Sequence, residues 1–324
     1  MKNYYPSFYD SFCCLASTCP DSCCAGWEIP VDEKSEKYYR SLNTGFGKLV
    51  VSKLTKNAED ETVFALENSR CPFLNKENLC DIRINFGHEH TCVTCRQHPD
   101  FIEEYDGFTE ICPSLSCPAA AALILSPQAR YPVHGTAGDD EYLVFLLSLR
   151  EEIFAILNSE GNFSAASADI IRLVYERENA FSGEYPGDDI PFENNAEYTP
   201  DEDEILNYFY EITACFSRLE ILTERWRKTV KTCLEADENT IKTALNRPWP
   251  EEIGILSYLM FRFFLKAVNG YSSAAVVRLI VCCVYTLRVY SRITDVPFAE
   301  ICRLFSKEIE HSAENTAQIA AYFL

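Results

Sequence analysis

A dense group of five cysteines occupies residues 12–27, which read FCCLASTCPDSCCAGW. Three further cysteine groups follow: CPFLNKENLCDI at 71–82, TCVTCRQHP at 91–99 and CPSLSC at 112–117. Eleven of the sixteen cysteines therefore lie within residues 1–117. In a reducing compartment such dense cysteines indicate metal or redox chemistry, because disulfide frameworks are rare there.

The composition is that of a folded globular protein, and the start of the chain indicates a reducing compartment. The 324 residues are 47% hydrophobic and 24% charged, which is too apolar for wholesale disorder. The first twelve, MKNYYPSFYDSF, lack the apolar run and cleavage site of a secretory signal, so we expect a cytoplasmic protein. Four basic residues interrupt the most apolar segment, 255–289, which predicts a buried helix pair and no membrane span.

The charge of the chain is strongly acidic. It has 29 Lys and Arg against 49 Asp and Glu, a net charge of -20, which argues against a nucleic-acid partner. Residues 181–204 are rich in acidic side chains and contain prolines and glycines, so we expect a linker or an exposed loop there. A negative lip that attracts a lysine-bearing partner is the alternative.

Two regions differ in their hydrophobic patterns. Residues 1–130 are rich in Cys, Pro, Asn and Gly and predict a loop-rich region that needs bound metal for its stability. From Asp139 onward, apolar residues recur at helical spacing behind capping residues. We therefore predict a mainly α protein, in which a loop-rich, cysteine-cluster metal-binding region (1–130) packs on a C-terminal α-helical bundle (131–324).

The helical region divides into several predicted helices. After a first helix that begins near Asp140, the patterns cover about 165–181, 201–236 with one possible break, 251–270, 272–293 and 297–321. The segment 272–293 is apolar on nearly every side, so we expect it to lie at the centre of the bundle. Five later cysteines fall in these patterns and are expected in the core: Cys215, Cys233, Cys282, Cys283 and Cys302.

The kind of metal is a question of ligand softness and spacing. Thiolate-rich surroundings favour zinc or an iron-sulfur cluster over calcium or magnesium. Only one CxxC pair, Cys92 and Cys95, is present, and a radical-SAM CxxxCxxC motif fails because Gly26 stands at its third position. His88, His90 and His98 lie among the cysteine groups as further ligand candidates, with surface histidines as the alternative interpretation. Zinc and iron-sulfur both stay open.

The run CPDSCCAGWEIPVD at 19–32, followed by CPFLNKENLCDI, CRQHPDF and SLSCPAAAALIL, resembles the flagellin lysine-N-methylase family. It is more distantly similar to a cysteine-rich zinc- or iron-chelating domain of bacterial proteins. The resemblance covers residues 12–126. It implies a bacterial cytoplasmic methyltransferase that transfers methyl groups from S-adenosylmethionine to lysines of flagellin, its protein partner, and that binds an iron-sulfur cluster of the 4Fe-4S type.

The same resemblance implies which cysteines hold the metal. Cys13 and Cys92 look like additions to the family pattern, and Asp100 stands where the family usually has an arginine. The motif positions that match the family are Cys19, Cys23, Cys24, Cys71, Cys80, Cys95 and Cys117. A four-iron cluster takes about four cysteine ligands.

The catalytic residues and the S-adenosylmethionine site are not assigned by the sequence. Trp27, Tyr38 and Tyr39 are candidates for cation-π contacts with a sulfonium or methylammonium group, and core packing is the alternative. Gly45-Phe46-Gly47 lacks the βαβ setting of a nucleotide-binding turn and is interpreted as an ordinary turn. Two competing classes stay open, a non-enzymatic zinc- or iron-binding adaptor and a thiol redox protein using Cys92 and Cys95.

Overall fold

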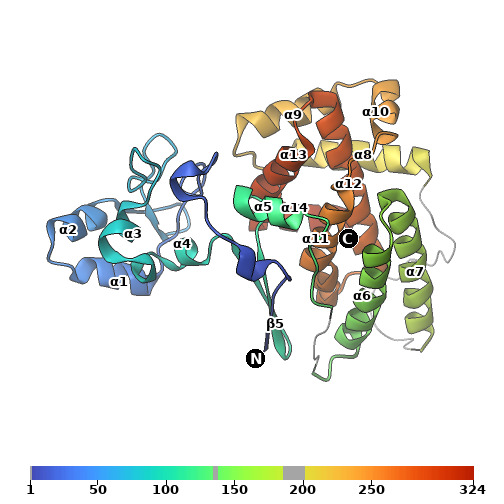
Figure 1. The fold of residues 1–324 in the computed structure, drawn as a ribbon, viewed down its shortest axis with the longest axis horizontal. Helices are drawn as coiled ribbons and strands as arrows, with labels where there is room; N and C mark the ends of the chain where they lie inside the picture. Colours follow the sequence, from blue (N-terminus) through green and yellow to red (C-terminus); the bar gives the residue numbers. More distant parts are fainter. Residues whose placement is uncertain (1, 134–137, 185–200) are drawn as a thin grey trace. The chain divides into compact units, whose positions relative to one another are not determined.

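The computed structural model describes residues 2–133, 138–184 and 201–324 of the chain. These residues form two compact units (Figure 1). The helical unit comprises Met1–Phe12, Ile102–Ser116 and Ala120–Leu324, and the thiol unit comprises Cys13–Phe101 and Cys117–Ala119. The sequence predicts a single boundary near residue 130, whereas the chain passes between the two units several times. Residues 108–113 belong to the helical unit because their strand pairs with the strand at residues 2–4.

Long helices build most of the helical unit, which confirms the predicted mainly α class. A short three-stranded sheet accompanies them, in the order β1 (Lys2–Tyr4), β5 (Phe108–Pro113), β4 (Asp100–Tyr105), with β1 parallel to β5. The helices are α5 (Pro118–Ile124), α6 (Glu141–Ser159), α7 (Phe163–Glu184), α8 (Glu202–Phe216), α9 (Glu224–Leu234), α10 (Glu238–Leu245), α11 (Glu252–Phe263), α12 (Ser273–Thr294), α13 (Phe298–Phe305) and α14 (Ala313–Phe323).

Helix α12 is the centre of the helical unit, as its apolar sequence predicts. It packs against α7, α8, α9, α10, α11 and α13 (Figure 1). By length and composition it is the one described helix that meets the criteria for a membrane span, yet 89% of its apolar window is buried inside the protein. A helix that is apolar all round and covered by other helices is a core helix.

Side-chain caps fix where several helices begin. Asp140 caps α6 by accepting a hydrogen bond from Leu143 N, and Ser272 caps α12 in the same way through Ala275 N. Asp201 and Glu204 form a capping box at the start of α8. Both ends of the predicted acidic segment 181–204 are helical, because α7 ends at Glu184 and α8 begins at Glu202. Residues 185–200 of this segment lie outside the part that the structure describes.

Two predicted helices are interrupted in the structure, and one carboxylate accounts for the first interruption. Residues 201–236 form α8 and α9, and the intervening loop donates to Glu308 from Leu222 N (2.7 Å) and from the backbone and hydroxyl of Thr223. The predicted helix 297–321 is divided by a π-helical turn, η5 (Ser306–Glu310), which carries Glu308. Helix α10 was not predicted. Tertiary contacts therefore set helix ends that periodicity alone does not show.

The thiol unit is built from short elements. They are η2 (Ala16–Thr18), α1 (Glu33–Ser41), α2 (Gly45–Ser52), the antiparallel pair β2 (Leu54–Lys56) and β3 (Thr62–Phe64), α3 (Asp81–Phe86), η3 (His88–His90) and α4 (Val93–Gln97). The interpretation of Gly45-Phe46-Gly47 as a turn is wrong, because these residues begin α2. Thr44 caps that helix by accepting from Gly47 N at 3.0 Å.

Candidate metal centre

Three separate segments of the thiol unit carry the cysteines that come together. Cys23 and Cys24 lie in the loop after η2, and Cys71 precedes the turn that leads to Cys80. Cys80 is the residue before α3, Cys92 is the residue before α4, and Cys95 lies within α4. We call Cys23, Cys24, Cys71, Cys80, Cys92 and Cys95 the thiol group.

Backbone hydrogen bonds hold these segments against one another. Cys71 N donates to Cys24 O at 2.8 Å, and Ala25 and Arg70 form an antiparallel bridge beside that bond. A second bridge joins Leu74 to Cys80 and closes the loop between the two cysteines of the second motif. Segments distant in sequence thus reach the same place through main-chain pairing.

The sulfur atoms of the thiol group lie close enough to interact. The Sγ atoms of Cys92 and Cys95 are 3.4 Å apart, and those of Cys23 and Cys24 are 4.0 Å apart. Electrostatic repulsion between their charged forms links Cys24 with Cys71 and Cys80, and links Cys95 with Cys24 and Cys80. All three segments therefore contribute to one neighbourhood.

Burial and hydrogen bonds between neighbouring cysteines raise the pKa of four of these thiols. Burial raises the pKa of Cys71 to about 12 and also raises the pKa of Cys80. The pKa values of Cys24 and Cys95 are raised by a hydrogen bond with the neighbouring cysteine and then by burial. In the Cys92–Cys95 pair, that same hydrogen bond lowers the pKa of Cys92. Thiolates gathered in so buried a place need a positive charge among them.

The donors of the thiol group suit a thiophilic metal. Two thiolates bound to one tetrahedral zinc at about 2.3 Å are about 3.8 Å apart, close to the separations within both sulfur pairs. Soft thiolates equally suit an iron-sulfur cluster. Among the described residues, no group of three or more metal-binding side chains is already arranged around a single point. The donor chemistry and the pair distances fit a metal, and the complete coordination shell is not preformed.

The thiol group includes five of the seven cysteines implied by the family resemblance, together with Cys92. Cys92 is buried and forms a pair with Cys95, although the sequence pattern set it aside as an addition. The CxxC spacing was the signal that identified it. Cys19 lies half-buried just after η2, and Cys117 lies half-buried in the return segment Cys117–Ala119 of the thiol unit.

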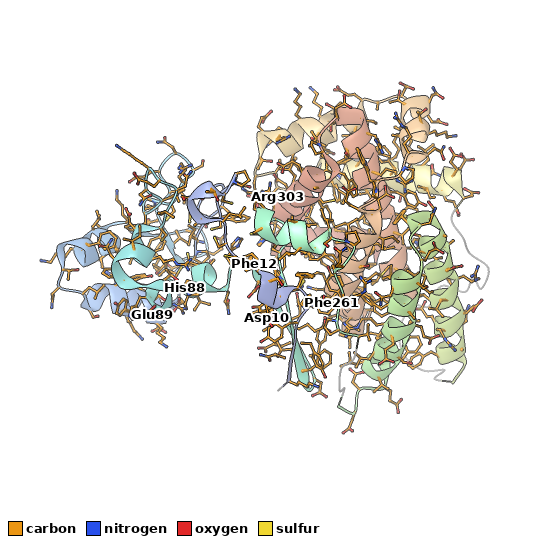
Figure 2. All side chains as sticks on the ribbon, in the orientation of Figure 1. Asp10, Phe12, His88, Glu89, Phe261 and Arg303 are labelled. Carbon is orange, nitrogen blue, oxygen red and sulfur yellow. The ribbon has the colours of Figure 1, made fainter. Side chains whose placement is uncertain are left out.

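The three histidine candidates lie in the thiol unit in different settings. His88 is exposed and is labelled in Figure 2 beside Glu89. The ring of His90 stacks on Tyr38 with centroids 4.3 Å apart, and the ring of His98 meets Trp27 edge to face at 5.8 Å. Two of the three therefore pack on aromatic rings.

The aromatic candidates adjoin the cysteine segments. Trp27 Nε1 donates to the carbonyl oxygen of Cys23 at 3.0 Å, so its ring is tied to the first cysteine loop. Tyr39 is fully buried, and its hydroxyl donates to His90 O at 2.8 Å. This contact gives Tyr39 a packing role, which was the alternative interpretation.

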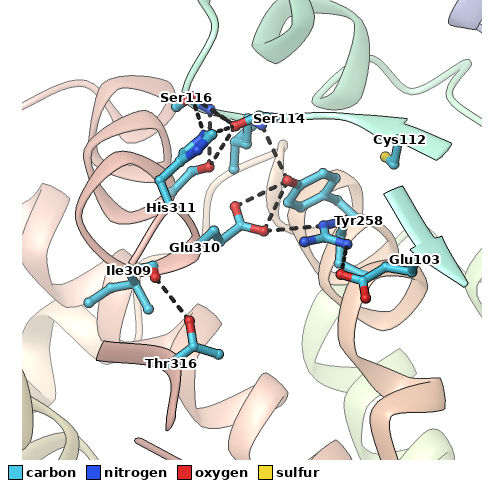
Figure 3. Close-up of polar contacts among 12 residues, drawn as sticks. Glu103, Cys112, Ser114, Ser116, Tyr258, Ile309, Glu310, His311 and Thr316 are labelled. Atoms are coloured by element: carbon cyan, nitrogen blue, oxygen red, sulfur yellow. Dashed lines mark hydrogen bonds and ion pairs between the residues drawn. The ribbon is translucent and has the colours of Figure 1, made fainter. Parts of the chain in front are cut away.

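A second concentration of ionisable groups is buried in the helical unit and was not identified from the sequence (Figure 3). Tyr258 donates to both carboxylate oxygens of Glu310, at 3.0 and 3.1 Å. Arg262 forms ion pairs with Glu310 at 3.6 Å and with Glu103 at 3.0 Å. Burial raises the pKa of Glu310. Arg262, one of the four basic residues that interrupt the apolar segment 255–289, was the sequence signal from which this network could have been found.

This buried network holds the last cysteine motif from one side. His311 Nε2 lies 2.8 Å from Ser114 Oγ and 3.0 Å from Ser116 Oγ (Figure 3). Arg303 donates to Ser116 O from Nε at 3.1 Å and from Nη2 at 3.0 Å. The residues between Cys112 and Cys117 are therefore fixed by the helical unit. The five later cysteines are all buried there, which confirms their predicted core positions.

Comparison with known proteins finds similarity to lysine-N-methylases and to a flagellar biosynthetic protein. The lysine-N-methylases of Salmonella choleraesuis and Salmonella typhimurium are each 31% identical to it over 129 residues, which is 37% of this chain and 32% of each relative. The chain thus spans about a third of the length of these relatives. The flagellar biosynthetic protein FliU of Salmonella muenchen is 30% identical over 129 residues, 37% of this chain and 75% of FliU.

No protein-family model and no solved structure matches the chain. The distant similarity to a cysteine-rich chelating domain therefore stays a prediction. The match to FliU covers three quarters of that protein at 30% identity, in agreement with the resemblance of the cysteine motifs. The chain belongs to the flagellin lysine-N-methylase family.

Proposed function

We propose that this protein is a lysine N-methyltransferase that acts on flagellin, uses S-adenosylmethionine as methyl donor and holds a metal in its thiol unit. The observation that carries the proposal is the gathering of six cysteines from three segments, in a chain related to lysine-N-methylases. An iron-sulfur cluster, 4Fe-4S, is the proposed metal group, and zinc is the alternative.

The thiol group would supply most of the metal ligands. Its members come from three segments, so one bound centre would close loops that are tens of residues long. Cys19 and Cys117 lie in the same unit and complete the proposed ligand set of Cys19, Cys23, Cys24, Cys71, Cys80, Cys95 and Cys117, to which Cys92 is now added.

The proposed role of the metal is to shape the thiol unit. Methylation of an amine displaces the methyl carbon of a sulfonium and requires a neutral nucleophile in line with the leaving sulfur. No electron is transferred in that displacement, so stabilisation of the thiol unit by the metal is sufficient to explain why the cysteines gather there. The acidic chain, with its net charge of -20, would attract lysine-rich surfaces of a protein substrate.

Transfer of a labelled methyl group tests the enzymatic activity. Anaerobically purified protein is incubated with flagellin and methyl-labelled S-adenosylmethionine, and modified lysines are located by mass spectrometry. We expect label on flagellin lysines with the parent protein and little label with Cys71→Ser. The matched control is Cys233→Ser, which changes a buried cysteine of the helical unit and should retain transfer.

The same experiment separates an enzyme from an adaptor. A non-enzymatic metal-binding adaptor would retain flagellin on an affinity column and leave its lysines unmodified. Metal-replete protein that binds flagellin without methylating it would contradict the proposed activity, although the metal site itself would stand.

A further inference from the structure

Asp32 links the first helix of the thiol unit to the CxxC pair. It caps α1, with Oδ1 accepting from Ser35 N at 3.0 Å and Oδ2 accepting from the Ser35 hydroxyl at 2.7 Å. The same Oδ2 accepts a third hydrogen bond from Val93 N at 2.8 Å. Val93 is the first of the two residues between Cys92 and Cys95, and it follows Asp32 by 61 residues in the chain.

The first amide of α4, Val93 N, is not capped by the residue before the helix. Cys92 occupies that position, and its side chain forms no capping hydrogen bond with Val93 N. The first amide groups of a helix lack partners within the helix, so Val93 N requires an acceptor from elsewhere. The carboxylate of Asp32 provides it across the fold, as a cap supplied by a distant segment.

A second contact from the same segment fixes the same turn. The hydroxyl of Thr94 donates to Pro30 O at 3.1 Å, so residues 30 and 32 hold two consecutive residues of the CxxC turn. Pro30 also pairs with Val63 of β3, and Val31 N donates to Thr62 O. The acceptors therefore belong to a segment that is itself paired with β3, which allows them to define the direction of the turn.

We propose that Asp32 is a positioning residue of the metal centre: its carboxylate holds the backbone between Cys92 and Cys95 and thereby directs both sulfur atoms toward the bound metal. The inference rests on the proposed function for the presence of the metal. Groups that hydrogen-bond around a metal site orient its ligands, and their loss lowers metal affinity by about 10- to 100-fold. A carboxylate also places a fixed negative charge beside the centre.

The chain offers a closely matched control in Asp237. This residue caps α10 with Oδ1 accepting from Thr240 N at 3.0 Å and Oδ2 accepting from the Thr240 hydroxyl at 2.7 Å. Its capping geometry repeats that of Asp32, but it lies in the helical unit, away from the cysteine segments in sequence. Asp237→Ala therefore removes the same kind of helix cap while the bond to Val93 remains.

Metal affinity and the spectrum of the bound metal distinguish a positioning role from a capping role. Parent protein, Asp32→Ala, Asp32→Asn and Asp237→Ala are titrated anaerobically with zinc and with cobalt(II), whose visible bands report ligand geometry. We expect Asp32→Ala to bind both metals about 10- to 100-fold more weakly, with altered cobalt bands. Asp237→Ala should match the parent, and Asp32→Asn, which retains an acceptor oxygen, should recover most of the affinity.

A measurement without metal keeps the inference testable on its own. The rate at which a thiol reagent modifies Cys92 and Cys95 in the metal-free protein should rise in Asp32→Ala and stay at the parent value in Asp237→Ala. Equal metal affinity, cobalt bands and thiol reactivity in these two variants would overturn the role of Asp32. A parent protein that binds neither metal would instead count against the proposed metal centre, and the thiol reactivities would still decide the role of Asp32.

Discussion

The helical unit and the thiol unit both bury cysteines, but in different surroundings. In the helical unit, Cys233 and Cys302 are fully buried and belong to no close pair of cysteines among the described contacts, and burial raises the pKa of each. In the thiol unit, buried and half-buried cysteines lie as close pairs contributed by separate segments. The same residue type thus serves as a small apolar side chain in one unit and as a candidate ligand in the other.

The two units also differ in the size of their hydrophobic cores. The helical unit surrounds α12 with other helices and buries many large side chains. The core cluster of the thiol unit has nine buried residues, two of which are cysteines: Ile29, Val31, Tyr39, Val50, Phe64, Cys71, Phe73, Ile82 and Cys92. A core this small supplies little stability, so we expect the thiol unit to depend on metal and the helical unit to be independent of it.

Removing the metal should have the largest effect and should be confined to one unit. A strong chelator, added under anaerobic conditions, is expected to unfold Cys13–Phe101, because metal binding supplies about 10 kcal/mol or more to small metal-dependent folds. Hydrogen exchange of the amides, resolved along the sequence, measures the effect. Amides of α12 should keep their protection, and unchanged protection in α1 to α4 would contradict the proposed dependence.

Removing one proposed ligand should have the next largest effect. Cys71→Ser or Cys80→Ser should lower the free energy of unfolding by several kcal/mol through loss of bound metal. Denaturant titration of the metal-loaded protein gives this free energy. Cys233→Ser is the control, since it also places a hydroxyl in a buried position, and equal losses in the two units would show that packing alone explains both.

A buried ion pair of the helical unit tests whether that unit can be destabilised without loss of metal. Arg288 donates to Glu252 from Nε at 2.7 Å and from Nη2 at 2.6 Å, with both side chains buried. Glu252→Ala would leave the Arg288 charge unpaired and should cost about 3–5 kcal/mol of folding stability. Metal content should stay at the parent value, and a loss of metal in this variant would argue against independent stabilisation of the two units.

The smallest predicted effect is the dependence of folding stability on pH, which should have opposite signs in the two units. Burial raises the pKa of Glu178, which accepts hydrogen bonds from Ser272 and Ser273. Its folded pKa exceeds its unfolded one, so its contribution is full below the unfolded pKa and declines as pH rises through the folded pKa. Glu178→Gln should remove this dependence in thermal melts between acid and neutral pH.

The thiol unit should respond to the same change of pH in the other direction. Protons compete with metal for thiolates, so acidification should release metal and destabilise this unit. Hydrogen exchange at two pH values separates the responses by segment. Parallel gains or losses in α1 to α4 and in α12 would contradict the difference between the units.

Local patterns predicted the helical unit well. Apolar spacing behind Asp140 gave α6, and the apolar segment 272–293 gave the central helix. The pattern 201–236 allowed for one break, but the place of the break between α8 and α9 could not be predicted, because the carboxylate of Glu308, over eighty residues away, accepts the hydrogen bonds of that loop. Contacts of that range leave no local signal.

The candidate site was predicted in part. The spacing and number of the cysteines identified the segments that meet, and the CxxC spacing marked Cys92 and Cys95 as a pair. The resemblance to a family pattern set Cys92 aside, whereas the structure places its sulfur 3.4 Å from that of Cys95. Asp32 belongs to a quoted motif, yet its bond to Val93 depends on the fold. Composition shows which donors exist, and tertiary structure decides which of them face one another.

Metal analysis together with the visible spectrum of anaerobically purified protein tests the central claim most directly. We predict stoichiometric bound metal, with the broad brown absorbance of an iron-sulfur cluster, or colourless protein with bound zinc if the alternative holds. The bound metal, and with it any iron-sulfur absorbance, should be lost in Cys71→Ser and kept in Cys233→Ser. Protein that is metal-free and whose thiol unit is nevertheless fully protected from hydrogen exchange would contradict the account.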